Sequence, residues 1–569
     1  MPSTLLSIAP PSTLLSIAPP STLLSIAPHP AAAQTEPLSR APLAKPAPHR
    51  RPAPPVSNRA ISIAALIWGT SIFLSRIIGL VREAVIGRTL GAGPDADVYW
   101  TAFVLPDFLN YLLAGGALSI VFIPIFQRQL SRHGEQQARE TFSTLFSFLT
   151  LLLLLATLAL HFAAPALVAL VAPGFSPAQL EQLTALTRII LPAQIFHILG
   201  GLFSAALQAR DSHTVPAFAP LIYTLGIIAG GLLSSSAEGF AWGVLAGSIA
   251  GPFLLPLLAC ARRGLLPRPR WNFRHPDLSD YLARSLPIML GFSIIAVDDW
   301  ILRREATLID SGAASTITYA KNLMKVPMGV FGLALGVASF PTLARLVAEG
   351  QVARMHYTLL GTLRTLFVLS FAAQAALSAN ATDLAALIYG RTRIDAEALQ
   401  TIGALTTLVS IALAAWSAQT LLARGFYALG NTWIPAVLGT FVALLFFPLY
   451  GLLREHYGLF GLAIASSLAI LLYTFALNIL LDRELARRGE RVDAHWNPFF
   501  VRTLVALGLA IGLGRAVAWV LPDDPSLLMT GLRAGLACGS AAVGFLIAAA
   551  MLEVGEARSL LQRVRRLRS

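Results

Sequence analysis

The chain has 569 residues, of which 56% are hydrophobic and 12% are charged, and its mean hydropathy is +0.68. About a quarter of the residues of a soluble globular protein are charged, so the composition excludes that class. The formal net charge of +13 would suggest a nucleic-acid partner in a soluble protein, but here the basic residues lie mostly in tails and alternate loops, which indicates a fixed membrane orientation and no nucleic acid.

Residues 1–58 form a low-complexity N-terminal segment. The nonapeptide PSTLLSIAP occurs three times, starting at Pro2, Pro11 and Pro20, and a Pro- and Ala-rich stretch follows. Such a segment has little to bury, so we expect a disordered cytoplasmic tail. A signal peptide is disfavoured because there is no basic n-region and prolines interrupt every apolar run.

From about residue 60 onward, apolar stretches dominate the chain. We count about fourteen, each near twenty residues long, which predicts an all-α polytopic membrane protein. Basic loops alternate with loops that hold almost no Lys or Arg, which predicts that both termini are cytoplasmic. An even number of spans agrees with that orientation. The two cysteines, Cys260 and Cys538, form no metal or disulfide pattern.

An internal repeat divides the predicted helices into two sets. Residues 208–217 resemble residues 427–436 at an offset of 219, and residues 117–124 resemble residues 334–341 at an offset of 217. Repeats of this kind build transporters from two six-helix lobes around a central cavity. We place the lobes at residues 60–265 and 275–485, followed by two helices in residues 495–553 and a basic cytoplasmic tail in residues 554–569.

The stretch SRIIGLVREAVIGRTLGAGPDAD, from Ser75 to Asp97, carries charges inside an apolar run. On one helix, Arg76, Gly79, Glu83 and Gly87 lie within about 80° of one another. Burying an Arg in a bilayer costs from ~2.5 to more than 10 kcal/mol, so this face is expected to line a cavity rather than to meet lipid. For Arg88, near the helix end, snorkelling to the membrane surface is the alternative.

Two further spans carry polar residues of ambiguous meaning. In the second span, Asp107 and Asn110 share a helix face and either bind a ligand or join helices. In the seventh span, Asp299 and Arg303 are one turn apart, so we favour a structural ion pair there over a ligand site.

The eighth span, TYAKNLMKVPMGVFGLALG, has Lys321 and Lys325 one turn apart, with Thr318 and Asn322 beside them. No carboxylate lies near them in the sequence. The two lysines therefore favour a surface that binds an anion over the alternative, snorkelling to the membrane surface.

The sequence contains no nucleophile–base arrangement, P-loop, dinucleotide fingerprint or metal-ligand spacing. We therefore expect no enzyme, no cofactor, no metal and no catalytic residue. The chain also lacks a nucleotide-binding domain, so an ion gradient, the membrane potential or removal of the transported substrate would have to drive transport.

Three stretches resemble the MurJ/MviN family, flippases of the peptidoglycan precursor lipid II. They are SRIIGLVREAVIGRTLGAGPDADVYWTAFVLPDFL, the eighth span and RGFYALGNTWIP at residues 424–435. The resemblance covers the chain from about residue 60 to its end. It implies a bacterial inner-membrane transporter whose cavity opens alternately to each side, with lipid II or another polyprenyl-pyrophosphate-linked saccharide as cargo. Membrane lipids and cell-wall synthesis enzymes are the other implied partners.

The resemblance also implies roles for individual residues. Arg76 and Arg82 would hold the pyrophosphate, with Glu83 as their acidic neighbour and Asp97 as the family's loop aspartate. The chain departs from the family at Asn110, where an Arg is usual. It departs again at Asn322 and Lys325, where the family has Arg and Glu. Lys321 and Lys325 appear close to the lost charges, so the cargo of this chain stays open between lipid II and a related lipid.

Two alternatives remain open at this stage. One is a cation-coupled exporter of drugs or of polysaccharide-linked lipids, which needs an unpaired carboxylate, Asp298 or Asp107, as its coupling site. The other is a paralogue that no longer transports and serves as a scaffold, a hypothesis motivated by the missing arginines.

Overall fold

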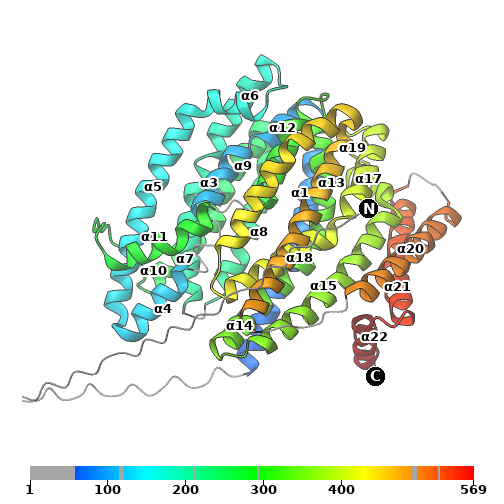
Figure 1. Cartoon of the computed structure of the whole chain (residues 1–569). Coiled ribbons are helices and arrows are strands. Elements are labelled where there is room, and N and C mark those ends of the chain that lie inside the picture. The colour runs from blue at the N-terminus through cyan, green and yellow to red at the C-terminus, as the bar shows by residue number, and fades with distance from the viewer. Residues whose placement is uncertain are drawn as a thin grey trace, which may run out of the picture. The chain divides into compact units, whose positions relative to one another are not determined.

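The computed structural model is helical throughout the residues that it describes, which are 58–114, 121–210, 212–290, 294–489, 496–522 and 526–568 (Figure 1). Within these ranges there is no strand. The predicted N-terminal tail lies outside them, so its disorder stays a prediction. The chain divides into two units between Val56 and Ser57, and the described helices belong to the second unit.

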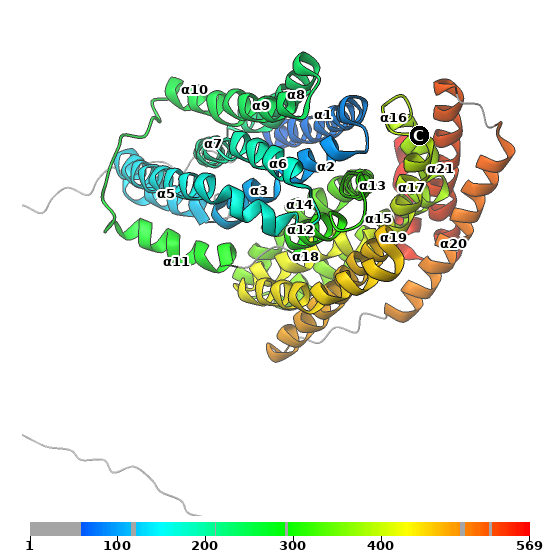
Figure 2. The same ribbon diagram turned by 90° about the horizontal axis from the view of Figure 1, so that it is seen from above.

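The first half of the chain forms a series of helices. They are α1 (Asn58–Leu90), α2 (Pro94–Thr101), α3 (Val104–Ala114), α4 (Ile123–Arg132), α5 (Gly134–Val171), α6 (Pro177–Ile190), α7 (Ala193–Gln208), α8 (Thr214–Ser234), α9 (Ala237–Ser248), the π-helix η2 (Ile249–Leu254) and α10 (Leu255–Arg262). Helices α8 and α9 approach closely, because a Cβ on Gly226 would lie only 2.5 Å from Cα of Gly247. Small residues of this kind let helices pack in a membrane. Figure 2 shows α1, α8 and α9 together.

The second half of the chain contains more broken helices. They are α11 (Pro276–Leu290), α12 (Ile294–Ala306), α13 (Ala313–Met328), the π-helix η3 (Gly329–Leu333), α14 (Ala334–Ala348), α15 (Val352–Ala379), α16 (Ala381–Tyr389), α17 (Ala396–Ser410), α18 (Leu413–Ala428) and α19 (Trp433–Arg487). Helix α19 is 55 residues long but turns sharply at Gly458, where φ is +55°. A positive φ of this size favours glycine, so this residue permits the turn.

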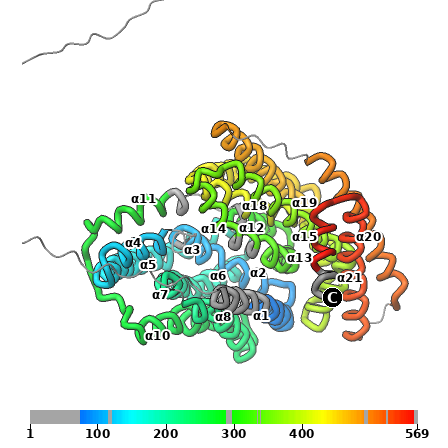
Figure 3. Tube along the Cα trace, turned by 90° about the horizontal axis from the view of Figure 1, so that it is seen from below, coloured from blue at the N-terminus to red at the C-terminus, as the bar shows by residue number. Residues whose placement is uncertain are grey.

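Three helices complete the chain: α20 (Trp496–Val520), α21 (Leu527–Met551) and α22 (Gly555–Arg568). Helices α20 and α21 pack against each other and against α15, at one edge of the bundle (Figure 3). The C-terminal segment that we expected as a basic tail is thus a helix over Gly555–Arg568.

The multi-pass membrane architecture is confirmed, but the number of spans is not. Eight helices of the described residues are long and apolar enough to cross a membrane, and a ninth forms if the bent pair Ala396–Ser410 and Leu413–Ala428 is one span. Helix α12 accounts for part of the difference, because it has 13 residues and a span requires 18. Fourteen spans and the lobe boundaries stay predictions.

Polar contacts fix α11, which begins the second half of the chain, against α4 and α5. Asp277 of α11 is 3% exposed and accepts hydrogen bonds from Gln129 (2.8 Å) and Thr141 (2.5 Å). One turn later, Asp280 pairs with Arg128 at 2.8 Å. Slight burial opposes ionisation of Asp280, but its hydrogen bonds, including the one from Arg128, hold its pKa below the usual value.

Candidate functional site

Helix α1 is one continuous helix, and its charged face turns toward α13, η3 and α16 rather than away from the protein. The Glu83 side chain accepts a hydrogen bond from Asn322 of α13 (3.0 Å) and one from Arg82 (2.5 Å), and Glu83 is only 4% exposed. Further along the face, a Cβ on Gly87 would lie 3.1 Å from the ring of Tyr389. The prediction that this face avoids lipid is therefore confirmed.

Arg76 lies on the same face of α1, two turns before Glu83. Its guanidinium rests against η3, since a Cβ on Gly329 would lie 2.0 Å from Nη2 of Arg76. A larger residue at position 329 would displace the guanidinium from this place. In the part of the chain that the structure describes, Arg76 forms no ion pair and no side-chain hydrogen bond.

The two lysines of α13 are paired with carboxylates of α12. Lys321 Nζ donates to Asp298 and, at 2.6 Å, to Asp299, while Lys325 Nζ donates to Asp299 at 2.7 Å. Both lysines are thus paired within the protein, and their binding of an anion stays a prediction. The carboxylates lie 22–26 residues earlier in the sequence, and only the packing of α12 against α13 brings the groups together.

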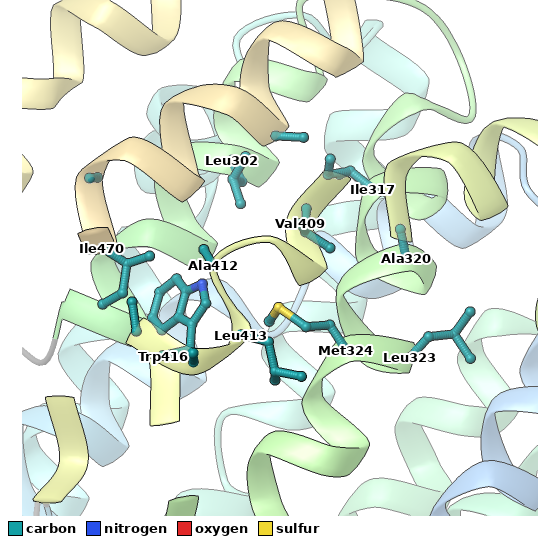
Figure 4. Close-up of a cluster of buried hydrophobic side chains, with 14 of the residues drawn as sticks. Leu302, Ile317, Ala320, Leu323, Met324, Val409, Ala412, Leu413, Trp416 and Ile470 are labelled. Carbon is teal, nitrogen blue, oxygen red and sulfur yellow. The ribbon is translucent and has the colours of Figure 1, made fainter. Parts of the chain in front are cut away.

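Asp298 is the most enclosed member of this cluster. Besides Lys321, it accepts hydrogen bonds from Tyr450 and from Ser466 (3.0 Å), and it is 2% exposed. The ammonium of Lys321 also lies 5.1 Å from the ring centre of Trp416. Figure 4 shows Trp416 within an apolar cluster to which α12, α13, α17, α18 and α19 contribute. Asp298 is thus neutralised inside the second half of the protein.

The predicted pair of Asp299 and Arg303 does not form. Both oxygens of Asp299 are taken by Lys321 and Lys325, and no ion pair of Arg303 occurs among the described residues. Arg303 nevertheless lines a small cavity between α12 and α13, together with Asp299, Leu302, Ile317, Thr318, Lys321 and Lys325. Spacing along the sequence does not single out this arginine, because Asp299, one turn earlier on the same helix, is placed to pair with it.

Asn110 and Asp107 of α3 have different surroundings. Asn110 donates a hydrogen bond to Gln194 of α7 at 2.7 Å, so it joins two helices. The side chain of Asp107 forms no hydrogen bond within the described residues, and it lies within electrostatic range of Arg303 and Lys325. Near it, the ring of Phe108 lies 5.4 Å from that of Trp300, so α3 meets α12 at this level.

Asp97 joins α2 of the first half to the start of α13 in the second half. Its carboxylate accepts hydrogen bonds from the backbone N–H groups of Gly312 and Ser315, both at 2.6 Å, and it is 1% exposed. It thereby caps the start of α13, whose first N–H groups have no partner within the helix. The Tyr319 hydroxyl adds a hydrogen bond to the carbonyl of Gly91 (2.7 Å). We call these contacts the closed end.

Comparisons with known proteins identify the family. The family model described as "Lipid II flippase MurJ" matches residues 86–522. Among curated relatives, the lipid II flippase MurJ of Burkholderia cenocepacia is 28% identical over 459 residues, covering 77% of this chain and 87% of the relative. The probable lipid II flippase MurJ of Haemophilus influenzae is 26% identical over 470 residues, covering 79% and 91%.

Solved structures show the same fold. "Lipid II flippase MurJ, inward closed conformation" matches with a TM-score of 0.69 and 19% identity, covering 87% of this chain and all of that one. An inward-facing multidrug transporter of the MATE family matches with a TM-score of 0.60 and 13% identity, covering 74% and 98%. The all-α transporter fold is thus confirmed. Since the family model spans more than half of the sequence, the chain belongs to the lipid II flippase MurJ family.

Proposed function

We propose that this protein is a lipid II flippase, which moves the lipid-linked peptidoglycan precursor from the cytoplasmic to the outer leaflet of the bacterial inner membrane. The observation that carries the proposal is the arginine face of α1. Arg76 rests against η3 of the second half, Arg82 is paired with Glu83, and Glu83 offsets only one of the two charges. A positive face turned into the protein suits an anion such as pyrophosphate.

The proposed transport cycle begins with capture of the pyrophosphate at the arginine face. Arg76 forms no ion pair in the described structure, so its guanidinium is available, whereas Arg82 is held by Glu83 at 2.5 Å. Two six-helix lobes, residues 60–265 and 275–485, then rock so that the closed end separates and the cytoplasmic side shuts. Opening requires Asp97 to release the backbone of Gly312 and Ser315.

The structure refines the roles that we propose for the remaining site residues. Lys325, whose side chain is 28% exposed, can reach an anion while it is paired with Asp299. Lys321, whose side chain is 5% exposed, is structural. Asn322 orients Glu83, and Asn110 joins α3 to α7.

The membrane potential is the proposed driving force. With the inside negative, moving an anion outward is favoured by ~2.3 kcal/mol per charge per 100 mV. Both termini face the cytoplasm in this proposal, and the polyprenyl tail follows a lipid-facing groove beside α20 and α21. The protein transports and catalyses no covalent step, and cell-wall synthesis enzymes are its proposed partners.

Complementation is the decisive test of the proposed function. The chain should restore growth to a bacterial strain depleted of its lipid II flippase, and the purified protein in liposomes should move lipid II across the bilayer. A scaffold would fail both assays. A cation-coupled exporter is not favoured, because the family model of the lipid II flippases matches most of the chain. One of its two candidate coupling carboxylates, Asp298, is also occupied by Lys321, Tyr450 and Ser466. An exporter would predict loss of transport when the sodium and proton gradients are removed.

A further inference from the structure

Among the residues that the structure describes, Arg303 is a buried cation without an ion-pair partner. It lies on α12, three residues before the helix ends at Ala306, and it is 9% exposed. Its Nη1 atom has no hydrogen-bond partner, and the described part of the chain contains no ion pair of this guanidinium. Burying an unpaired Arg at a membrane helix is costly, by ~2.5 kcal/mol or more. Such a residue is expected to bind a ligand or to change its surroundings when the protein changes conformation.

The carboxylates around Arg303 are committed to other groups. Asp299, one turn earlier, holds Lys321 and Lys325 with its two oxygens. Glu305 is paired with Arg304 and, at 3.1 Å, with Arg454. Asp107 is the remaining acid that acts on Arg303; it belongs to α3, in the other half of the protein, and makes no ion pair with it. Arg303 therefore keeps its positive charge available.

The position of Arg303 connects it to the cavity and to the closed end. Arg303 lines the cavity between α12 and α13 next to Lys325 and Thr318. Thr318 lies one turn along α13 from Ser315, whose N–H Asp97 holds, so the cavity is adjacent to the closed end. Helix α3 lies on another side of α12, which it meets through Phe108 and Trp300. Separation of α3 from α12 would remove Asp107 from Arg303.

We infer that Arg303 is a pyrophosphate ligand of the second lobe, which receives the lipid-linked anion beside the closed end and selects pyrophosphate over monophosphate. This inference rests on the proposed function. A guanidinium can bind two phosphate oxygens at once in a fixed geometry, which the ammonium of Lys325 cannot do. Arg76 on α1 and Arg303 on α12 then bind the anion in the two lobes, and Arg303 supplies the guanidinium that α13 lacks at Asn322.

The test measures binding of farnesyl pyrophosphate and farnesyl monophosphate to the purified full-length protein in detergent. In Arg303→Gln we expect affinity for the pyrophosphate to fall about tenfold, as for loss of a charge-assisted hydrogen bond, and affinity for the monophosphate to change by less than about twofold. Arg303→Lys should keep most of the affinity but lose the preference for pyrophosphate. Lipid II translocation in liposomes should fall in parallel with pyrophosphate affinity.

Arg304→Gln is the matched control. Arg304 is the next residue on α12, but it is paired with Glu305 and stacks over Phe447 at 5.3 Å, so its loss should leave the pyrophosphate preference unchanged. Equal affinity and equal preference in wild type and Arg303→Gln would overturn the inference while leaving the flippase proposal intact. If the wild-type protein neither binds farnesyl pyrophosphate nor moves lipid II, the proposed function itself is wrong. If Arg303→Gln does not fold, the preference measured for Arg303→Lys decides the matter.

Discussion

Two walls of charged residues face each other across the middle of the protein, and they reach a similar charge by different means. The α1 wall, made of Arg76, Arg82 and Glu83, has two cations and one anion on a single helix. The α12–α13 wall is made of Asp298, Asp299, Arg303, Lys321 and Lys325, with three cations and two anions on two helices. Each wall keeps one positive charge after pairing.

The difference lies in what holds each wall together. In the α1 wall the partners are adjacent in sequence, so one helix builds it and its spare cation, Arg76, rests on the glycine of a neighbouring helix. In the α12–α13 wall every ion pair crosses between helices, so the wall exists only while α12 and α13 stay packed. An unpaired positive charge can thus arise in two ways. Either one helix carries more cations than anions, or the carboxylate that could pair with the cation pairs with other cations instead. The following changes test this contrast, in order of decreasing expected effect.

The largest effect is expected in the α12–α13 wall. Asp298→Ala leaves Lys321 buried without its closest counter-ion, and removing one member of a buried pair costs about 3–5 kcal/mol. Thermal and denaturant unfolding of the purified protein should show the loss. The double variant Asp298→Ala with Lys321→Met should recover most of the stability, because no buried charge is left alone. A loss below about 1 kcal/mol in the single variant would contradict the ion-pair assignment.

A substitution in the α1 wall should reduce the rate of transport rather than the stability of the protein. Arg76→Ala removes an unpaired cation, so folding should be little affected, while translocation of lipid II should fall about tenfold to a hundredfold, as for loss of a charged hydrogen bond of about 1.5–3 kcal/mol. Translocation in liposomes under a fixed potential measures this. Arg88→Ala, at an exposed position of the same helix, is the control. Equal activities of the two variants would remove Arg76 from the site.

The closed end should control how the two walls separate. Asp97→Asn keeps one acceptor oxygen for the two N–H groups of Gly312 and Ser315, which should weaken the closed state by about 1–2 kcal/mol. The rate of maleimide labelling of Ala314→Cys, a buried position beside these groups, should rise about tenfold. Asp95→Asn, on the exposed face of α2, serves as the control. Unchanged labelling would show that Asp97 does not hold the end closed.

The smallest effect is expected at Asn110. Asn110→Leu breaks the hydrogen bond to Gln194 and should cost about 1 kcal/mol of stability, with translocation changed by less than about twofold. The double variant with Gln194→Leu should be no less stable than the single one, since no buried partner is then left unsatisfied. A large transport defect in Asn110→Leu, without loss of stability, would instead make this residue a ligand of the anion.

The sequence by itself determined the class of the protein, the charged face of α1 and the family resemblance. These features depend on composition, on periodicity along one helix and on contiguous motifs, so no packing information is needed. The sequence also identified the charged residues of both walls as candidates. It could not show which of them form ion pairs, because spacing rules describe contacts within one helix and not between helices.

Only the tertiary structure decided which of these charges are free. Packing of α12 against α13 diverts Asp299 from Arg303, its neighbour one turn away, to Lys321 and Lys325, 22 and 26 residues further along the chain. Folding likewise carries Asp97 to backbone groups 215 and 218 residues away. A carboxylate buried in a membrane protein pairs with whichever cation the helix packing places beside it, so Arg303 became the spare cation of its wall.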